Sequence, residues 1–568
     1  MIRTLLLLTL LLPVCTNAAN YYWVGGSGNW SNYAAHWATT SGGGTFHTQV
    51  PSSLDDVFFD ANSFSGPGQT VTADQTIVYC RHMDWTGVTN MPSFAALNPN
   101  ITLKIYGSLA FSAGMNLAFN GTVSMETLSS GMTVTSAGRT FSGALEFNGF
   151  GGEWTLQDSL HSTNEIMLSL GVLRTNNHNI RCADFTSSGN APRSLFLGTS
   201  TVTLPGSYAS FAITDSLITL DADSAIIRIE LGDFYVHGKT SRFKFNLVEF
   251  YSTSGVMMDQ VYRGTNTHAK KVIFRSYGEI RRPSNRIDSL ICHDHLWING
   301  YGDIDLTYAQ VANDLLMHTP SNAPADSIQY ITIGGNMELG QVSSANNYFG
   351  KALINGDLLM DTQPGDVQTF VYCSIGGDGT FTADNTFDTL KLSVGRTYEF
   401  ESGRTQTITQ YFDAFGQPGF PIQWVASGIG TQSTLNLLQP YFCTDYIYVR
   451  DMNGTGPGQR FLGANSNNVA NNTGWQFVAC SPMSVEEEMT SGISVFPNPA
   501  EEQWIISLAS FSTPLQAQVL DLQGRTVKRF TLSAAQTSID CADWARGVYI
   551  LKLTDENGAP LSSRLVKR

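Results

Sequence analysis

Charged residues are scarce in this 568-residue chain, where only 14% of the positions are Asp, Glu, Lys or Arg. Acidic residues outnumber basic ones by 47 to 32, which gives a formal net charge of −15. A protein that grips phosphates needs a basic surface, so this balance argues against nucleic acid as a partner. Helical periodicity is almost absent, whereas Gly, Ser, Thr, Asn and aromatic residues are plentiful. This composition is typical of strands and turns and predicts an all-β protein.

The chain also lacks the short motifs of familiar catalytic sites. It contains no nucleophile elbow, phosphate-binding loop, zinc-protease helix or pair of cysteines two residues apart. Beyond the N-terminal leader, no apolar run is long enough to cross a bilayer as a helix. We therefore predict no catalytic residue, no metal site and no cofactor. The question of enzymatic activity stays open, with a non-enzymatic role favoured.

The first 19 residues have the pattern of a secretory signal peptide. A positive start at Arg3 is followed by the apolar run 5–14, which is too short to span a membrane, and then by small residues that end at Ala19. We predict cleavage after Ala19. Cys15 invites a lipoprotein interpretation, but Val14 stands where lipid attachment requires a small residue.

Eight cysteines are spread widely along the chain, at positions 15, 80, 182, 292, 373, 443, 480 and 541. An exported protein can form disulfides, and the count becomes even once both termini are removed. The wide spacing also fits single buried thiols that act as small apolar side chains. The sequence leaves both alternatives open and favours the buried thiols.

Internal repeats organise the middle of the chain. The segment 278–280 leading to 285–290 recurs as 379–381 leading to 385–390, and 313–317 recurs as 355–360. Strand-turn units that cannot bury their own apolar face must stack on their neighbours. We predict a right-handed parallel β-helix over residues 65–480, with residues 20–64 as its N-terminal cap. Stacked antiparallel sheets remain the alternative.

Five Asn-Gly pairs interrupt these strands. Both residue types tolerate positive φ, so the pairs are predicted to turn the chain sharply between strands. They are Asn120-Gly121, Asn148-Gly149, Asn299-Gly300, Asn355-Gly356 and Asn453-Gly454.

The C-terminal segment 493–568 follows an acidic stretch, residues 481–492, that has the character of a linker. Short runs in it alternate apolar and polar residues, which predicts an Ig-like β-sandwich. The order of its motifs, 495–500, 504–506, 519–525, 547–552 and 566–568, resembles the C-terminal sorting domain of the type IX secretion system. The resemblance implies recognition by that machinery, export across the outer membrane, and anchoring to the surface or release.

The start of the predicted mature chain supports the same route. The segment 21–30, with His36-Trp37 and the segment 54–60, resembles the opening of large repeat-rich surface proteins that this secretion system exports. Low charge, the internal repeats and the C-terminal segment together favour an extracellular or surface-attached structural, adhesin-like protein. The alternatives are a polysaccharide-binding module and a polysaccharide-active β-helix enzyme.

Three groups of residues are weak candidates for ligand binding. The first is Trp23, Trp30 and Trp37, which either close the end of the coil or form an aromatic platform for sugar rings. The second is a basic cluster that either binds an acidic glycan or forms an ordinary solvated face of the solenoid. Its members are Lys270, Lys271, Arg275, Arg281, Arg282 and Arg286.

The third candidate is the pair His293 and His295. Residues two apart on a strand share a face, so both imidazoles would meet one cation, although no third ligand is visible nearby. Acidic residues 55, 56 and 60 fall short of a calcium shell and fit turn positions better.

Six Asp-[Ser/Thr]-aliphatic tripeptides begin at residues 158, 215, 223, 288, 326 and 388. They resemble the acceptor motif of periplasmic O-glycosylation in bacteria that use this export route. An aspartate that hydrogen-bonds backbone at a strand entry accounts for them equally well.

Overall fold

The structure is a computed structural model. It describes residues 18–214, 217–237, 242–252, 260–281, 285–300, 304–318, 325–340, 346–362, 365–480, 493–508, 515–554 and 560–568. The chain divides into two compact units, residues 1–480 and 481–568. The predicted signal peptide up to residue 17, the acidic stretch 481–492 and Arg282 lie outside the described residues.

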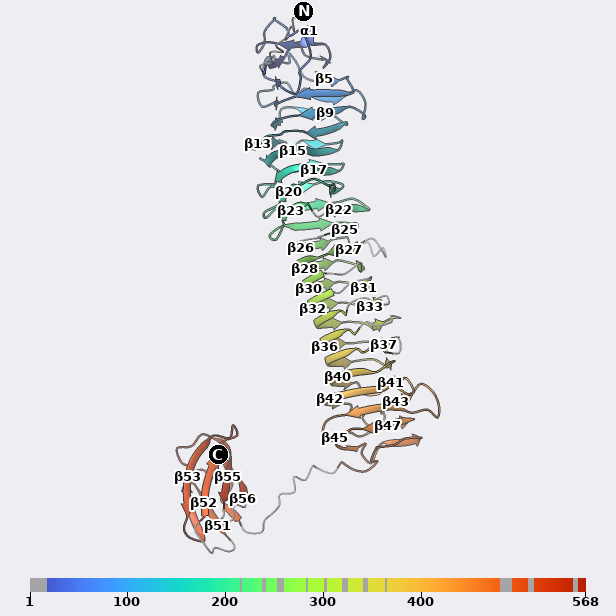
Figure 1. The fold of residues 1–568 in the computed structure, drawn as a ribbon, viewed down its shortest axis with the longest axis vertical. Coiled ribbons are helices and arrows are strands. Elements are labelled where there is room, and N and C mark those ends of the chain that lie inside the picture. Colours follow the sequence, from blue (N-terminus) through green and yellow to red (C-terminus); the bar gives the residue numbers. More distant parts are fainter. Residues whose placement is uncertain are drawn as a thin grey trace, which may run out of the picture. The chain divides into compact units, whose positions relative to one another are not determined.

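The first unit is a parallel β-solenoid (Figure 1). In its second half each rung contributes one strand to each of two sheets, here called sheet 1 and sheet 2. Register is parallel throughout this stretch: Met337 pairs with Leu358, and Leu358 pairs with Gly379. The prediction of a parallel β-helix is confirmed, and the alternative of stacked antiparallel sheets is wrong for this unit.

The strands of this half alternate between the two sheets. Sheet 1 holds β25 (Gly232–His237), β27 (Gln260–Thr265), β29 (Gly278–Arg281), β31 (Leu296–Asn299), β33 (Leu315–His318), β35 (Met337–Leu339), β37 (Leu358–Met360), β39 (Gly379–Phe381), β41 (Thr397–Phe400) and β43 (Ile422–Ala426). Sheet 2 holds β26 (Phe243–Phe250), β28 (Thr267–Phe274), β30 (Asn285–Cys292), β32 (Ile304–Val311), β34 (Ser327–Ile333), β36 (Tyr348–Ile354), β38 (Thr369–Ile375), β40 (Asn385–Leu392), β42 (Thr405–Asp413) and β44 (Ser433–Leu437).

The N-terminal rungs carry additional short strands. β2 (Gly28–Asn29), β5 (Thr70–Ala73), β8 (Ser93–Ala96) and β11 (Asn116–Ala118) form a separate small parallel sheet. β1 (Asn20–Trp23) lies between β3 (Trp37–Ala38) and β4 (Asp56–Phe58), pairing antiparallel with β3 and parallel with β4. The short helix α1 (Tyr33–His36) precedes β3.

The interior of the coil is a stack of like side chains. Alternate residues of each strand point inward, and parallel register places each one on its counterpart in the next rung. Phe349, Phe370 and Phe387 stack in this way, with ring centroids 4.5 and 5.2 Å apart. The repeats found in the sequence correspond to equivalent positions of different rungs: 313–317 and 355–360 lead into β33 and β37, two rungs apart.

Polar side chains form a second kind of stack inside the coil. Asn385 is buried, and its side-chain amide donates to Gln406 Oε1 at 2.9 Å, in the next rung, and to Thr382 O at 2.8 Å. At the equivalent place in an earlier rung, Asn285 Nδ2 donates to Gly264 O at 2.7 Å. A buried amide is stable only with such partners, which ties each rung to its neighbour.

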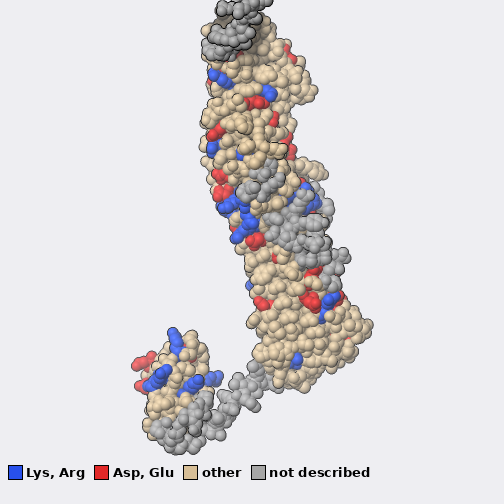
Figure 2. Space-filling view, in the orientation of Figure 1, with Lys and Arg blue, Asp and Glu red and all other residues tan. Residues whose placement is uncertain are grey.

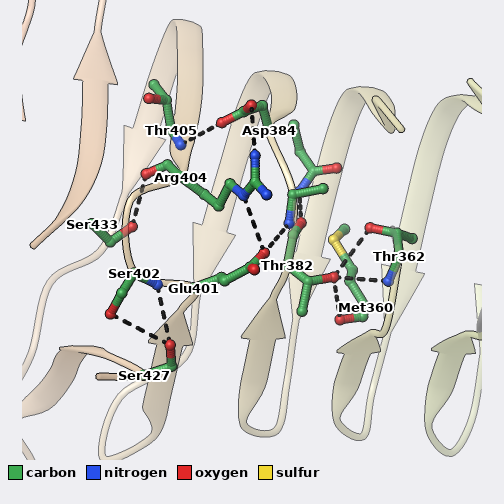
Figure 3. Close-up of polar contacts among 12 residues, drawn as sticks. Met360, Thr362, Thr382, Asp384, Glu401, Ser402, Arg404, Thr405, Ser427 and Ser433 are labelled. Atoms are coloured by element: carbon green, nitrogen blue, oxygen red, sulfur yellow. Dashed lines mark hydrogen bonds and ion pairs between the residues drawn. The ribbon is translucent and has the colours of Figure 1, made fainter. Parts of the chain in front are cut away.

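Hydrogen bonds between rungs continue where the strands of sheet 1 end (Figure 3). Thr382 Oγ1 donates to Met360 O at 2.8 Å, one rung away. In the rungs that follow, Ala383 N–H donates to Glu401 Oε2 at 2.7 Å, and Thr405 N–H donates to Asp384 Oδ1 at 2.6 Å.

Three of the five Asn-Gly pairs, 120–121, 299–300 and 355–356, lie at a strand end or in the bend beyond it, as predicted, whereas 148–149 and 453–454 lie inside strands. Of their ten residues only Gly300 has a positive φ, of 139°, and Asn148 lies inside a long strand, β15 (Leu145–Leu156). Close approach between rungs explains the glycine at position 356. A Cβ there would lie 2.6 Å from Gly335 O and 2.3 Å from Asn336 Oδ1. At Gly356 it is therefore the close approach of the neighbouring rung, and not a positive φ, that requires glycine, and sequence alone cannot distinguish the two.

The cysteines divide between the two alternatives. Cys443 and Cys480 form a disulfide near the C-terminal end of the solenoid. Cys80, Cys182, Cys292, Cys373 and Cys541 are free and buried. Burial raises the pKa of the Cys292 thiol to about 12, so this thiol is protonated and inert at neutral pH.

The second unit is a small antiparallel β-sandwich with its own core. One sheet holds β50 (Ile493–Phe496), β51 (Gln503–Leu508) and β54 (Gln536–Asp540). The other holds β53 (Thr526–Leu532), β52 (Leu515–Leu520), β55 (Gly547–Thr554) and β56 (Pro560–Lys567). Trp504, Val519, Leu551 and Leu565 are fully buried between them. This arrangement agrees with the predicted Ig-like sandwich.

The alternation in β37 gives a matched test of the interior. Leu358 is 1% exposed, whereas its neighbour Leu359 points outward and is 40% exposed. Leu358→Ala should lower the free energy of unfolding by about 2 to 4 kcal/mol, through lost burial and a residual cavity. Leu359→Ala should have little effect. Chemical denaturation of both variants checks this, and equal midpoints would contradict the assigned faces.

Candidate functional site

The three tryptophans of the predicted N-terminal cap are buried in the core. Trp23, Trp30 and Trp37 are all 0% exposed. Their rings pack edge to face, Trp37 lying at 84° to Trp23 and at 72° to Trp30. A sugar platform needs exposed and coplanar rings, so the structure corrects that hypothesis in favour of packing at the end of the coil.

The basic residues do not line one groove. Arg281 lies on sheet 1 and pairs with Glu279 of the same strand. Arg286 lies on sheet 2, with Asp288 at 3.1 Å, and Lys270 Nζ donates to Asp223 O at 2.9 Å. Figure 2 shows basic and acidic side chains lying beside one another on the visible face. The cluster in the sequence is therefore divided between two faces and largely neutralised.

Glu249, the partner of Arg275, is also enclosed, with a side chain only 8% exposed. Its carboxylate accepts from Arg275 at 2.7 Å and from Arg228 at 3.0 Å. Burial by itself would raise the pKa of Glu249, but the hydrogen bonds from Arg275 and Arg228 outweigh it and hold the pKa below its ordinary value of 4.5.

This pKa shift predicts a pH-dependent contribution to stability. Because the folded pKa is depressed, the contribution is present above pH 4.5 and lost as the pH falls through the folded value. Glu249→Gln should be less stable than the wild type at neutral pH, and the difference should shrink under acid. Denaturation midpoints across this range measure it. Asp361→Asn, at an exposed position, is the control, and a difference that does not vary with pH would contradict the prediction.

The two histidines do not share a strand face. β30 ends at Cys292 and β31 begins at Leu296, so His293 and His295 lie in the bend between them. His293 is exposed. His295 Nδ1 accepts from Asp314 N–H at 3.3 Å, and its Nε2 lies 3.4 Å from Asp294 Oδ1. Among the described residues no group of three or more potential ligands is placed to hold a metal ion.

The acidic residues of the cap have structural partners. Asp55 accepts from the backbone N–H groups of Ala19 at 3.0 Å and Ser52 at 2.9 Å. Asp56 forms an ion pair with Arg81 at 2.6 Å.

Two of the Asp-[Ser/Thr] tripeptides have an aspartate carboxylate that accepts a hydrogen bond from backbone N–H. Asp158 Oδ1 accepts from Ser136 N–H at 2.8 Å, and Asp326 Oδ1 accepts from Ile304 N–H at 3.0 Å. Both partners lie in the preceding rung and not in the aspartate's own turn. Asp215 and Ser216 lie outside the described residues. Glycosylation at these motifs stays a prediction.

A cavity of about 380 Å³ opens on the outer face of sheet 1 and is lined by residues of β31, β33 and β35 and of the corners that precede β29, β31, β33 and β35. Its lining includes Trp297, Leu316 and Glu338, which are consecutive in register on successive strands. Tyr277 and His295, from the corners that precede β29 and β31, complete one side. Of these residues sequence reasoning found His295 alone. The others become visible only when the outward positions of successive rungs are aligned.

The outer face of sheet 1 contains a buried carboxylate on β29. Glu279 is 0% exposed, and its Oε2 has no hydrogen-bond partner among the described residues. Burial, followed by the negative charge of Glu279, raises the pKa of Tyr277 to about 12. The Tyr277 phenol therefore stays protonated at neutral pH and keeps an O–H that can donate a hydrogen bond.

Residues 494–568 match the model of the family described as the secretion system C-terminal sorting domain. The predicted recognition is thereby confirmed for this unit. The sorting domain marks the protein as exported and then attached to the cell surface or secreted. None of the helical segments in the described part of the chain has the length and hydrophobicity needed to cross a membrane.

Among curated proteins, the chain is similar to an endo-acting ulvan lyase of Formosa agariphila. The two are 28% identical over 95 residues, which is 16% of this chain and 18% of the lyase. The chain thus matches less than a fifth of that relative's length.

Deletion of residues 494–568 tests the sorting role. Because the solenoid has a core of its own, we expect the shortened protein to fold but to stay in the periplasm. Cell fractionation with immunoblotting measures this, with the full chain as control. Normal amounts of the shortened protein outside the cell would contradict the assignment.

Proposed function

We propose that the chain is a structural and adhesive solenoid that acts outside the cell, either held at the surface or released. The observation that carries this proposal is a ladder of side chains along one corner of the coil. Asp314 Oδ1 accepts from Asn336 N–H at 2.7 Å, and Asn336 Oδ1 accepts from Asp357 N–H at 2.8 Å. Asp357 Oδ1 in turn accepts from Asp378 N–H at 2.8 Å.

This ladder uses polar side chains to join rungs. Each acceptor satisfies a backbone donor that the corner would otherwise leave to water. Rungs joined by backbone, interior stacks and corner ladders give a continuous coil, which suits a protein that presents an extended surface. The sorting domain supports the location at which such a surface acts.

A strain that keeps the signal peptide and residues 481–568 but lacks residues 20–480 tests the adhesive role. Its cells should attach less to polysaccharide-coated surfaces than cells with the full chain. Re-expression of the full chain should restore attachment, and counts of retained cells under flow measure both. Unchanged attachment after removal of the solenoid would overturn the adhesive part of the proposal.

The second candidate is an enzyme that acts on polysaccharide. It is supported by the similarity to the ulvan lyase and by His295 beside Tyr277 in an open cavity. Its test is incubation of the purified solenoid with ulvan, followed by size-exclusion chromatography of the polymer. Shortened ulvan chains would favour this candidate, and an unchanged size distribution would exclude this activity on ulvan.

A further inference from the structure

The cavity on sheet 1 combines features of a ligand site. Its volume, about 380 Å³, lies within the usual range for small-molecule sites. It opens across four successive rungs and so offers an elongated surface along the coil axis. Its lining comes from short strands of sheet 1 and from the corners that precede them, and hydrogen bonds between rungs, such as that from Asn336 N–H to Asp314 Oδ1, position these side chains before any ligand arrives.

Aromatic and aliphatic side chains form its apolar part. Trp297 of β31 and Leu316 of β33 are neighbours in register, and Tyr277 lies at the corner before β29. All three are partly exposed, unlike the cap tryptophans. Flat rings at a half-open surface provide large contact area with little loss of conformational entropy. Sugar rings present apolar faces that match such a surface.

The polar part of the cavity is acidic. Asp314 and Glu338 have side chains that are 44% and 45% exposed, and both line the cavity beside His295 and Asn336. No Lys or Arg is among the described residues that line it. Carboxylates accept hydrogen bonds from hydroxyl groups and attract amino groups, and they repel carboxylate or sulfate groups on a ligand.

We propose that this cavity is a glycan-binding site that takes sugar chains without negative charge and prefers those with free amino groups. The sugar rings lie against Trp297 and Tyr277, and hydroxyl or amino groups donate to Glu338 and Asp314. The site gives the adhesive solenoid of the proposed function a ligand class, and it rests on that function only for its location outside the cell.

Isothermal titration of the purified chain with three soluble oligosaccharides tests the site. The probes are oligomers of β-1,4-glucosamine, β-1,4-glucose and galacturonic acid. We expect glucosamine oligomers to bind most tightly, glucose oligomers more weakly and galacturonate oligomers not at all. Binding of the glucosamine oligomers should weaken with added salt, because exposed charges are screened.

Two variants locate the binding. Trp297→Ala should weaken both uncharged and amino-sugar oligomers about tenfold, through loss of the aromatic face. Glu338→Gln should weaken glucosamine oligomers much more than glucose oligomers. Leu359→Ala is the matched control, because Leu359 pairs in register with Glu338 in the next rung and lies outside the cavity. Unchanged denaturation midpoints establish that each variant is folded.

The site is overturned if neither glucosamine nor glucose oligomers bind, if galacturonate binds best, or if folded Trp297→Ala binds as well as the wild type. If the oligosaccharides do not bind in the cavity, the attachment experiment still tests the adhesive role, because the solenoid can mediate adhesion through another surface. Conversely, oligosaccharide binding with unchanged cell attachment would overturn the adhesive role and keep the site.

Discussion

The fold depends on the parallel backbone hydrogen bonds that join each rung to the next. Parallel register places every residue above the equivalent residue of the preceding rung, as Met337, Leu358 and Gly379 show. Each stacked side chain must then pack favourably against a side chain of similar chemical type in the next rung. Aromatic rings meet aromatic rings, and buried amides meet amides, because a lone polar group in such a column would lose its partner.

The same constraint organises the outer surface. Outward residues also stand in columns, so a functional surface arises from residues one rung apart and not from neighbours in sequence. Trp297, Leu316 and Glu338 follow one another in such a column although about 20 residues separate each from the next. In other columns the outward charges meet their partners directly, as Arg228 and Glu249 do, and become part of the stability of the coil.

This geometry explains what the sequence could predict. The repeated strand-turn units are sufficient to predict the parallel coil. The ordered motifs of the last 75 residues are sufficient to predict the sorting domain. The sequence does not show which residues of each strand point inward, because the number of residues per rung varies. Hence the sequence predicts one strand face for His293 and His295, although β30 ends at Cys292. The cavity on sheet 1 depends on which residues point outward, so the sequence does not predict it either.

The two ends of the coil must be covered by other parts of the chain, because an unpaired terminal strand can pair with a strand of another chain. At the N-terminal end the bulk of three buried tryptophans closes the interior. At the other end the last strand, β49 (Asn467–Ala470), exposes every side chain, and Trp475 packs against Trp424 beneath it. The disulfide between Cys443 and Cys480 fixes the chain just beyond this strand. At both ends, local packing of aromatic side chains therefore covers the apolar interior of the coil.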